Sequence, residues 1–378
     1  SGWQLVARDS SAKKRISKPG AVYLWARTPA GSPGTSLKYS TMTVAKFSLR
    51  EASQIGTDES LERSSNSFSI AVIGDTQEET RWSTDPRFAD RTKWLAEHKN
   101  SLNLKYVLHT GDIVNWGWLA PQQFTRARSA MNYLTAAGVP YSVAVGNHDT
   151  RSVGWDGLPG STGYGGGPYS QNPECPTKLD AYECKSWRLV RHTEEFNDTF
   201  SISSLTARIK GQFEPGKIDN TWTTFTVLNT KWMILSLEFT PRRSAVEWAR
   251  KVVAKHPDHN VIIITHYYLD SNGKISPSNA GYGETSGKYL YEQIVSKYPS
   301  VKIVAAGHTG RFTSRTDTSR GNRIVSYLGN MMTNSENPVR VLTINVKTGV
   351  VSNTVYSKVS ESGATRASTG KAKLSIIR

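Results

Sequence analysis

The sequence has few cysteines, no long apolar run and no dense run of basic residues, and each absence narrows what the chain can be. Only Cys175 and Cys184 are cysteines among the 378 residues. This excludes a cysteine-rich structural zinc domain, because such sites use four nitrogen or sulfur ligands. No apolar stretch approaches the roughly 20 residues that a membrane-spanning helix needs. We therefore expect a globular protein without a transmembrane segment.

The two cysteines lie close together in a segment rich in Pro, Asn, Tyr and Gly. An even number of cysteines permits a local disulfide, which would indicate an oxidising compartment. Two reduced thiols at the surface are the alternative. We favour a Cys175–Cys184 disulfide and, with it, a secreted or extracellular location.

Basic residues outnumber acidic ones, 47 to 31, which gives a formal net charge of +16. Such a balance favours polyanionic partners, namely nucleic acid, an anionic cell-wall polymer or a membrane surface. The alternative is that the charge only keeps the protein soluble, since no run of five or more Lys and Arg residues occurs. Because the charges are scattered and form no stripe suited to a duplex, nucleic acid is the less favoured partner.

The length exceeds that of a usual single domain, so we expect one large domain with appendages. Residues 1–64 show strand-like alternation, clearest from Thr35 to Leu49, and predict a small β-rich module followed by a polar linker. Residues 68–356 form the predicted main domain. Residues 357–378 are small, polar and mildly basic, and predict a flexible tail.

Strands and helices alternate through the main domain. Apolar runs at 68–73, 106–108 and 139–145 predict strands, and the periodic segments between them predict helices over 86–100 and 122–137. This βαβαβ pattern is typical of a mainly parallel sheet covered by helices. Further along, helices are predicted over 244–255 and 288–297 and strands over 221–229, 232–238, 261–265, 301–306, 324–327, 339–345 and 350–356.

Five of the apolar, mostly β-branched runs stop at a carboxylate, an amide or an imidazole. Carboxyl ends of strands in an open α/β sheet face a common crevice, so these polar residues are expected to converge. Carboxylate and amide oxygens with neutral imidazoles suit Mn, Fe or Zn, and the absence of thiolates argues against a purely structural zinc. The residues are Asp75, Asp112, Asn147 with His148, His266 and His308.

The motifs around these residues are Gly-Asp-X-X, Gly-Asp-X-X-Asn, Gly-Asn-His-Asp, a lone strand-end His and Gly-His-X-X. In this order they resemble the motifs of the calcineurin-like metallophosphoesterases. The resemblance covers roughly residues 68–356 and implies an α/β fold, a four-layer αββα sandwich of mixed sheets flanked by helices. It also implies hydrolysis of phosphate esters at a centre of two divalent ions, with Mn, Zn, Fe or Ca as candidates.

Carried over by position, the resemblance implies a ligand set for each ion. Asp112 would bridge both ions, and Asp75 would bind the first. The second ion would be completed by Asn147, His266 and His308.

The resemblance also implies roles for residues that bind no metal. His148 would protonate or stabilise the leaving oxygen, and Asn115 would orient His148. Tyr267 and Arg311 flank predicted ligands and are candidates for substrate contact.

Two motifs depart from the family pattern. Asp75-Thr76-Gln77 stands where the family commonly has Asp-X-His, and Gly307-His308-Thr309-Gly310 stands where it has Gly-His-X-His. Both missing histidines would serve the first ion, which leaves the amide oxygen of Gln77 or water to fill in. Ligation by oxygen alone favours Mn, Mg or Ca over Zn and predicts a weakly held first ion.

These observations predict a secreted metal-dependent phosphoesterase. A phosphodiesterase acting on an anionic polymer, such as a cell-wall teichoic acid, or on a lipid-derived ester is favoured, because a basic surface concentrates such substrates. A phosphomonoesterase, including a phosphoprotein phosphatase, is the close alternative, and a nuclease comes third. A protein that binds a phosphate-bearing ligand through a degenerate metal site is the alternative from another class.

Overall fold

The computed structural model describes residues 65–154, 172–175, 178–205, 208–310, 312–330, 335–360 and 363–378. They belong to the second of two compact units of the chain, Glu59–Arg378. The β-rich module expected over residues 1–64 and the candidate substrate contact Arg311 lie outside the described residues.

The first sheet has six strands, and the three at one side of it, which come first in the unit, run parallel to each other. The remaining three extend it on one side in antiparallel order. From edge to edge the strands are β13 (Gly363–Lys373), β12 (Val350–Ser360), β11 (Val339–Asn345), β1 (Ser67–Ile73), β2 (Leu104–His109) and β3 (Tyr141–Val143).

The second sheet has seven strands and is also mixed. Four consecutive strands within it are parallel, and hairpins close both of its edges. In order they are β4 (Ile209–Gln212), β5 (Thr221–Val227), β6 (Thr230–Ser236), β7 (Asn260–Ile264), β8 (Val301–Ala306), β10 (Asn322–Leu328) and β9 (Thr313–Ser319). The predicted β5–β6 pair turns at Leu228 and Asn229, which both have positive φ, as a two-residue hairpin turn requires.

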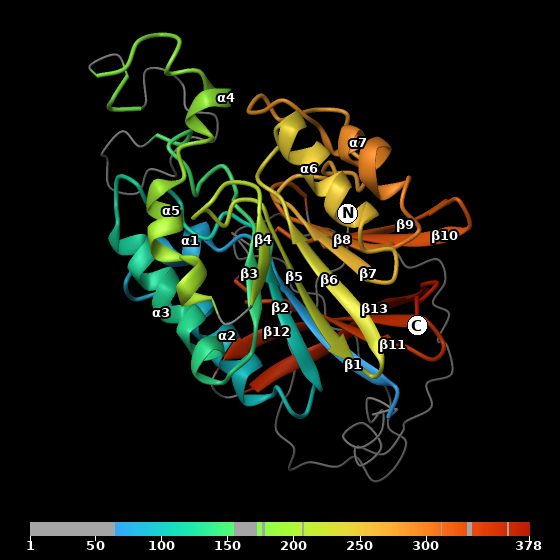
Figure 1. The fold of residues 1–378 in the computed structure, drawn as a ribbon. Coiled ribbons are helices and arrows are strands. Elements are labelled where there is room, and N and C mark those ends of the chain that lie inside the picture. Colours follow the sequence, from blue (N-terminus) through green and yellow to red (C-terminus); the bar gives the residue numbers. More distant parts are fainter. Residues whose placement is uncertain are drawn as a thin grey trace, which may run out of the picture. The chain divides into compact units, whose positions relative to one another are not determined.

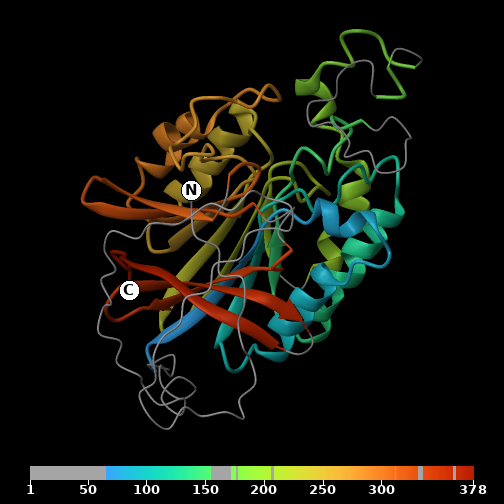
Figure 2. The same ribbon diagram turned by 180° about the vertical axis from the view of Figure 1, so that it is seen from behind.

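The two sheets pack face to face, and helices cover both outer faces (Figures 1 and 2). β1 shows why its sequence is apolar without alternation: Phe68 and Ile70 face the second sheet, whereas Ala71 and Ile73 face the helices. The helices α2 (Arg87–Glu97), α3 (Gln122–Ala136) and α5 (Glu194–Thr199) cover the first sheet, while α6 (Arg243–Ala254) and α7 (Gly287–Leu290) cover the second. The predicted four-layer αββα sandwich is therefore confirmed.

Several short elements complete the unit. The helix predicted over 288–297 divides into α7 and a π-helical segment, Tyr291–Val295. Short helices also occur at α1 (Gln77–Arg81), α4 (Ser186–Leu189) and a 3₁₀ turn, Ile202–Ser204. None of the helices in the described part of the chain has both the length and the apolar character that crossing a membrane requires.

The C-terminal residues differ from the flexible tail expected over 357–378. β12 continues to Ser360, and β13 pairs with it along most of its length. Leu374 is buried in the core between the sheets, and Ile377 exchanges two backbone hydrogen bonds with the side chain of Asn260, at 2.8 and 2.9 Å. The small and polar residues of this segment gave no apolar alternation, because backbone pairing rather than side-chain burial stabilises most of the strand.

The predicted disulfide is present. Cys175 and Cys184 are bonded, with their Cα atoms 6.1 Å apart, and both residues are buried. The bond closes a loop beside α4, within the part of this segment that the structure describes.

Candidate metal centre and active site

The loops that carry the motifs leave neighbouring strand ends and are bonded to one another. In the loops that follow β1 and β2, the backbone amide of Thr76 donates to the backbone carbonyl of Asp112 at 2.9 Å. In the loops that follow β7 and β8, the backbone amide of Gly307 donates to the backbone carbonyl of His266 at 2.9 Å. These backbone contacts hold the loops of each sheet in register. The predicted convergence of the strand ends is therefore what the structure has.

Glycines in the motifs allow the carboxylates to lie against the backbone. A Cβ atom on Gly146 would stand 2.1 Å from Oδ1 of Asp112, and one on Gly307 would stand 2.1 Å from Oδ1 of Asp75. Neither distance is sterically allowed, so both positions require glycine. The Gly-Asn-His and Gly-His motifs thus have a packing reason for their glycines.

Three predicted ligands form a tight cluster. The ligand atoms of Asp112, His266 and His308 all lie within 4.8 Å of one another. Nε2 of His266 is 2.9 Å from Oδ2 of Asp112 and 3.3 Å from Nδ1 of His308. Nδ1 of His266 lies 2.8 Å from the carbonyl oxygen of Thr110 and donates to it, which leaves the Nε2 lone pair directed at the cluster. Two imidazole nitrogens and a carboxylate that face one point provide the donor set of a transition-metal site.

Asn147 adds a second sign that a cation belongs here. Its Nδ2 donates to the hydroxyl of Tyr282 at 3.2 Å, while its Oδ1 is buried and accepts no hydrogen bond from the described residues. A buried carbonyl oxygen left in this state costs about 1–3 kcal/mol. A metal ion bound beside the cluster would satisfy it. The residues present therefore fit the second ion that the sequence predicts.

The residues predicted for the first ion are also buried, but their set is thinner. Asp75 accepts from the backbone amide of His308 at 3.0 Å, and Gln77 donates from Nε2 to Oδ2 of Asp112 at 3.3 Å. Burial, reinforced by the nearby Asp112 carboxylate, raises the pKa of Asp75 to about 7. A carboxylate so placed ionises more readily beside a cation, which is consistent with an oxygen-rich site.

Two of the predicted ligands have a backbone conformation that non-glycine residues rarely adopt. Asp112 has a φ of 51° and His308 a φ of 71°. Positive φ of this kind costs roughly 1–2 kcal/mol per residue. Strain of this order persists where the surrounding structure enforces it, and it is concentrated at functional sites.

His148 lies beside the cluster and contacts both Asp112 and Asn115. Its backbone amide donates to Oδ1 of Asp112 at 2.9 Å. Its Nδ1 is 2.8 Å from Oδ1 of Asn115 and 2.8 Å from the carbonyl oxygen of the same residue. The predicted contact between Asn115 and His148 is thus present in the structure.

Asp149, the last residue of the Gly-Asn-His-Asp motif, braces its loop. Oδ1 accepts from the amides of Ile113 and Val114 at 2.8 and 3.1 Å, and Oδ2 accepts from the amide of Gly146 at 2.8 Å. Burial, together with the charge of Asp112, raises the pKa of Asp149 to about 8. With both oxygens occupied by backbone amides, Asp149 connects the second and third motif loops.

Tyr267 contacts the cluster through its ring rather than through its hydroxyl. The ring centroid lies 4.8 Å from that of His308, and the hydroxyl accepts from Oγ of Ser276 at 2.8 Å. Phe239 packs against the rings of both cluster histidines, at 5.4 and 5.0 Å. Tyr267 and Phe239 thus form an aromatic wall on one side of the site.

Sequence reasoning missed three residues of this site. Phe239 and Tyr282 reach the site from loops in which no periodic pattern or motif marks them. Glu78 accepts from Nδ2 of Asn115 at 2.8 Å, although nothing in the sequence pairs the two residues. Only its place directly after Gln77 could have drawn attention to it.

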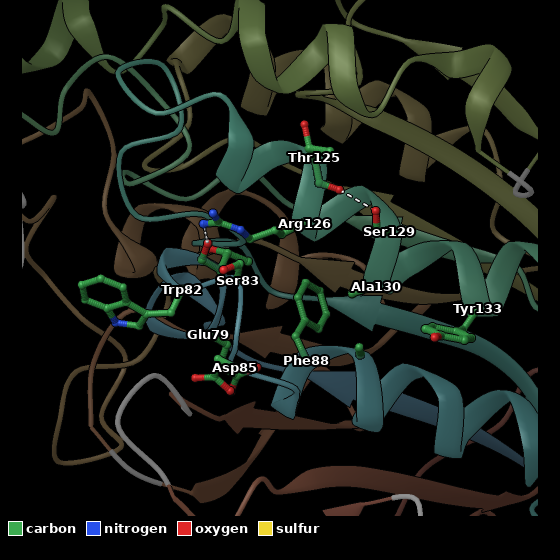
Figure 3. Close-up of a pocket in the computed structure, with 12 residues that line it drawn as sticks. Glu79, Trp82, Ser83, Asp85, Phe88, Thr125, Arg126, Ser129, Ala130 and Tyr133 are labelled. Carbon is green, nitrogen blue, oxygen red and sulfur yellow. Dashed lines mark hydrogen bonds between the residues drawn. The ribbon is translucent and has the colours of Figure 1, made fainter.

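A pocket between α1, α2 and α3 is separate from these residues (Figure 3). Trp82, Phe88 and Tyr133 are among its lining residues, and none of the predicted ligands is. Arg126, which points into it, donates to the backbone carbonyl of Thr80 at 2.9 Å. The pocket is therefore not part of the metal centre.

A second group of acidic side chains already has cationic partners. Glu214, Asp219 and Glu238 lie close enough together to hold an ion. However, Arg242 is 2.5 Å from Glu214 and 2.9 Å from Glu238, and Arg191 lies 3.3 Å from Glu238. Two guanidinium groups thus supply the positive charge that a metal would otherwise provide.

Residues 68–312 match the sequence model of the family described as calcineurin-like phosphoesterase. This chain belongs to the calcineurin-like phosphoesterase family. Members of this family normally bind divalent metals and act on phosphate esters, and the Asp112, His266 and His308 cluster could hold such a metal. The family match covers the five motifs and both sets of predicted ligands.

Among curated proteins, this calcineurin-like phosphoesterase is similar to the Uncharacterized protein YvnB of Bacillus subtilis (strain 168). The two are 26% identical over 230 residues, or 61% of this chain. The chain spans only 14% of the length of that relative.

Three solved structures are similar in fold at low sequence identity. Purple acid phosphatase PPD1 from yellow lupin (Lupinus luteus) seeds has a TM-score of 0.47 and 16% identity, with 77% of this chain and 52% of that chain covered. A dimetal phosphatase from Danio rerio has a TM-score of 0.47 and 11% identity, with 80% and 99% covered. GAP50, the anchor in the inner membrane complex of Plasmodium, has a TM-score of 0.43 and 10% identity, with 82% and 90% covered.

Proposed function

We propose that this calcineurin-like phosphoesterase is a secreted phosphodiesterase that hydrolyses an anionic polymer or a lipid-derived ester. The observation that carries the hydrolytic part is the cluster of Asp112, His266 and His308 beside the unpartnered Oδ1 of Asn147. The net charge of +16 supports an anionic polymer as substrate, because it raises the local concentration of polyanions. The Cys175–Cys184 disulfide supports secretion.

Two ions would be held by residues already described. Asp112, Asn147, His266 and His308 would hold the second ion, and Asp75, Asp112 and Gln77 the first. Divalent ions bound in this way lower the pKa of a water ligand to about 7 and neutralise phosphoryl oxygens. Because the first set lacks imidazoles, we expect the first site to prefer Mn, Mg or Ca.

The residues of the chain supply the proton and the orientation. A water would release one proton to solvent, and its oxygen would bond to phosphorus while the bond to the leaving oxygen breaks. Nε2 of protonated His148 would transfer its proton to that leaving oxygen. The imidazole is then neutral and regains a proton from solvent. Asn115 keeps Nδ1 of His148 hydrogen-bonded throughout, so Nε2 stays directed at the reacting group.

Two alternatives are kept. The basic charge would also attract a phosphomonoester, so a phosphomonoesterase remains the close alternative. The missing histidines at Gln77 and Gly310 favour a binding protein with a degenerate site. Against that alternative stands His148, because a pure binding protein has little need of a leaving-group acid.

The test compares a diester with a monoester. The protein is stripped with a chelator, reloaded with Mn, Zn, Mg or Ca, and assayed on bis(p-nitrophenyl) phosphate and p-nitrophenyl phosphate, with His148→Ala as the comparison variant. We expect faster turnover of the diester. In the variant we expect a strongly reduced kcat on diphenyl phosphate, whose poor leaving group needs a proton donor, and a smaller loss on the p-nitrophenyl esters. Faster monoester cleavage would replace the diesterase by a phosphomonoesterase, and no turnover with any metal would favour the binding protein.

The choice of polymer is tested with salt. On poly(glycerol phosphate), electrostatic attraction predicts a KM that rises with ionic strength while kcat stays constant, since exposed charges are screened beyond about 10 Å at 0.1 M salt. A KM that does not respond to salt would remove the argument from charge.

A further inference from the structure

We propose that Glu78 is a positioning residue that fixes the side-chain amide of Asn115 and, through it, the imidazole of His148. The inference rests on the proposed function, since it assigns a role toward the leaving group. It extends the predicted pair of Asn115 and His148 by a third residue, located on α1.

The contacts form a continuous chain. Nδ2 of Asn115 donates to Oε1 of Glu78 at 2.8 Å, and Oδ1 of Asn115 lies 2.8 Å from Nδ1 of His148. The three residues come from different segments, because Glu78 follows β1, Asn115 follows β2 and His148 follows β3.

The chemistry of a carboxylate decides how this chain is oriented. An ionised carboxylate only accepts hydrogen bonds, so Asn115 has to present its NH₂ group to Glu78. Its carbonyl oxygen is then the atom that faces His148, and an oxygen only accepts. Nδ1 of His148 must therefore carry a hydrogen, which leaves Nε2 as the nitrogen that faces the reacting group.

Arg81 holds Glu78 in place. Its guanidinium lies 2.7 Å from Oε2 of Glu78, the carboxylate oxygen that Asn115 does not use. The same guanidinium lies over the ring of Trp116, 4.9 Å from its centroid, next to Asn115 in sequence. The exposed fractions of the two charged side chains are only 7% for Arg81 and 22% for Glu78, so water competes little for these bonds.

The backbone of Asn115 is fixed independently of Glu78. Oε1 of Gln123 accepts from the amides of Asn115 and Trp116, at 2.8 and 3.2 Å. What Glu78 adds is the orientation of the side-chain amide, which could otherwise rotate and present NH₂ to His148. The backbone carbonyl of Asn115 also accepts from Nδ1 of His148. Removal of Glu78 should therefore weaken the orientation of the His148 imidazole without abolishing it.

The test uses leaving groups of different basicity. A poor leaving group depends on a correctly placed proton donor, whereas p-nitrophenolate leaves with little help. For Glu78→Ala we expect kcat on diphenyl phosphate to fall about ten-fold, with KM nearly unchanged and a much smaller effect on bis(p-nitrophenyl) phosphate. Glu78→Gln keeps an oxygen acceptor for Asn115 and should recover most of the loss. Glu97→Ala, at an exposed position at the end of α2, is the matched control.

Three outcomes would overturn the proposal. The first is an unchanged kcat in Glu78→Ala, and the second is an equal loss of kcat on both substrates. The third is a Glu78→Gln variant that binds as much metal as the wild type but does not recover activity. Metal analysis of each variant separates loss of an ion from loss of orientation, because a lost ion lowers turnover of both substrates.

A second readout does not depend on turnover. Long-range ¹H–¹⁵N correlation spectra of the magnesium-loaded protein report which ring nitrogen of His148 carries hydrogen. We expect the Nδ1–H form in wild type and a mixture of tautomers in Glu78→Ala. If wild type hydrolyses neither diester, the proposed function fails, whereas the spectra still decide the positioning role. Identical spectra for wild type and Glu78→Ala would refute it.

Discussion

His266 and Asp112 meet across the interface of the two sheets, with Nε2 of the first 2.9 Å from Oδ2 of the second. His266 follows β7 of the second sheet, and Asp112 follows β2 of the first. The hydrogen bond from Nδ1 of His266 to the carbonyl of Thr110 spans the same interface. An ion bound by both residues would therefore join the two halves of the sandwich.

Metal removal should lower the thermal stability of the protein. A ligand that binds only the folded state at 100 times its Kd stabilises by about 2.7 kcal/mol. Chelation should accordingly lower Tm by several degrees, and the added divalent ion should restore it. Differential scanning calorimetry with and without chelator measures the change. His308→Ala should show a smaller difference in Tm, and an equal difference would mean that the ion binds elsewhere.

The size of this effect should depend on pH. Burial disfavours the charged imidazolium, but the Asp112 and Asp75 carboxylates outweigh it and raise the pKa of His266 from 6.5 to about 9. In the chelated protein, the stability that protonated His266 gains from the two carboxylates is fully present below pH 6.5. It is lost as the pH rises to about 9. The pKa of Asp75 is raised from 3.8 to about 7, so Asp75 also lowers stability as the pH rises. Its contribution is lost between pH 3.8 and about pH 7.

Metal binding has the opposite pH dependence, because the ligands must be deprotonated. The difference in Tm between metal-loaded and chelated protein should therefore widen steadily from about pH 5 to about pH 9. Calorimetry of both forms across this range is the measurement. If the difference in Tm instead narrows as the pH rises, the ion does not displace protons from His266 and Asp75.

Gly146→Ala should abolish metal binding by displacing Asp112. The added Cβ would stand 2.1 Å from Oδ1 of Asp112 and 2.3 Å from its backbone nitrogen, so the loop has to move. Overpacking of this kind costs about 1–3 kcal/mol, and we expect the bound metal to fall with the stability. Gly138→Ala is the control: a Cβ atom there meets no atom within 4 Å, but Gly138 has a positive φ of 67°, which strains an alanine. It should lose stability and keep its metal, as measured by Tm and metal analysis.

The residues of the candidate metal centre could be predicted to lie together because each of them follows a strand that the sequence marks strongly. β-branched runs such as Asn260–Ile264 predict a buried strand by themselves, and the polar residue after each run needs only the rule that strand ends converge. Glu78 escaped prediction for a different reason. Its contact with Asn115 depends on how the short helix α1 packs, and a five-residue helix has too little periodicity to be recognised.

The C-terminal strand shows the same limit within the fold. Gly363–Lys373 consists of small and polar residues, so neither β-propensity nor alternation marks it. Its partner β12 is instead recognisable over Val350 to Tyr356, where Val351 and Val355 are buried. Strand pairing of this kind is set by the partner, which the local sequence does not encode.

Removal of residues 362–378 should destabilise the whole unit rather than trim a tail. The truncation exposes the edge of β12, removes Leu374 from the core between the sheets, and leaves the side chain of Asn260 without its two bonds to Ile377. Burial of a leucine side chain contributes about 1.5–3 kcal/mol, and a buried amide left unsatisfied costs about 1–3 kcal/mol. Urea unfolding should therefore show a loss of at least about 2 kcal/mol in the free energy of unfolding.

Leu374→Ala alone should reproduce part of this loss, whereas Lys371→Ala, at an exposed position of the same strand, should not. A truncated protein as stable as the full chain would mean that the pairing of β13 contributes nothing to the fold.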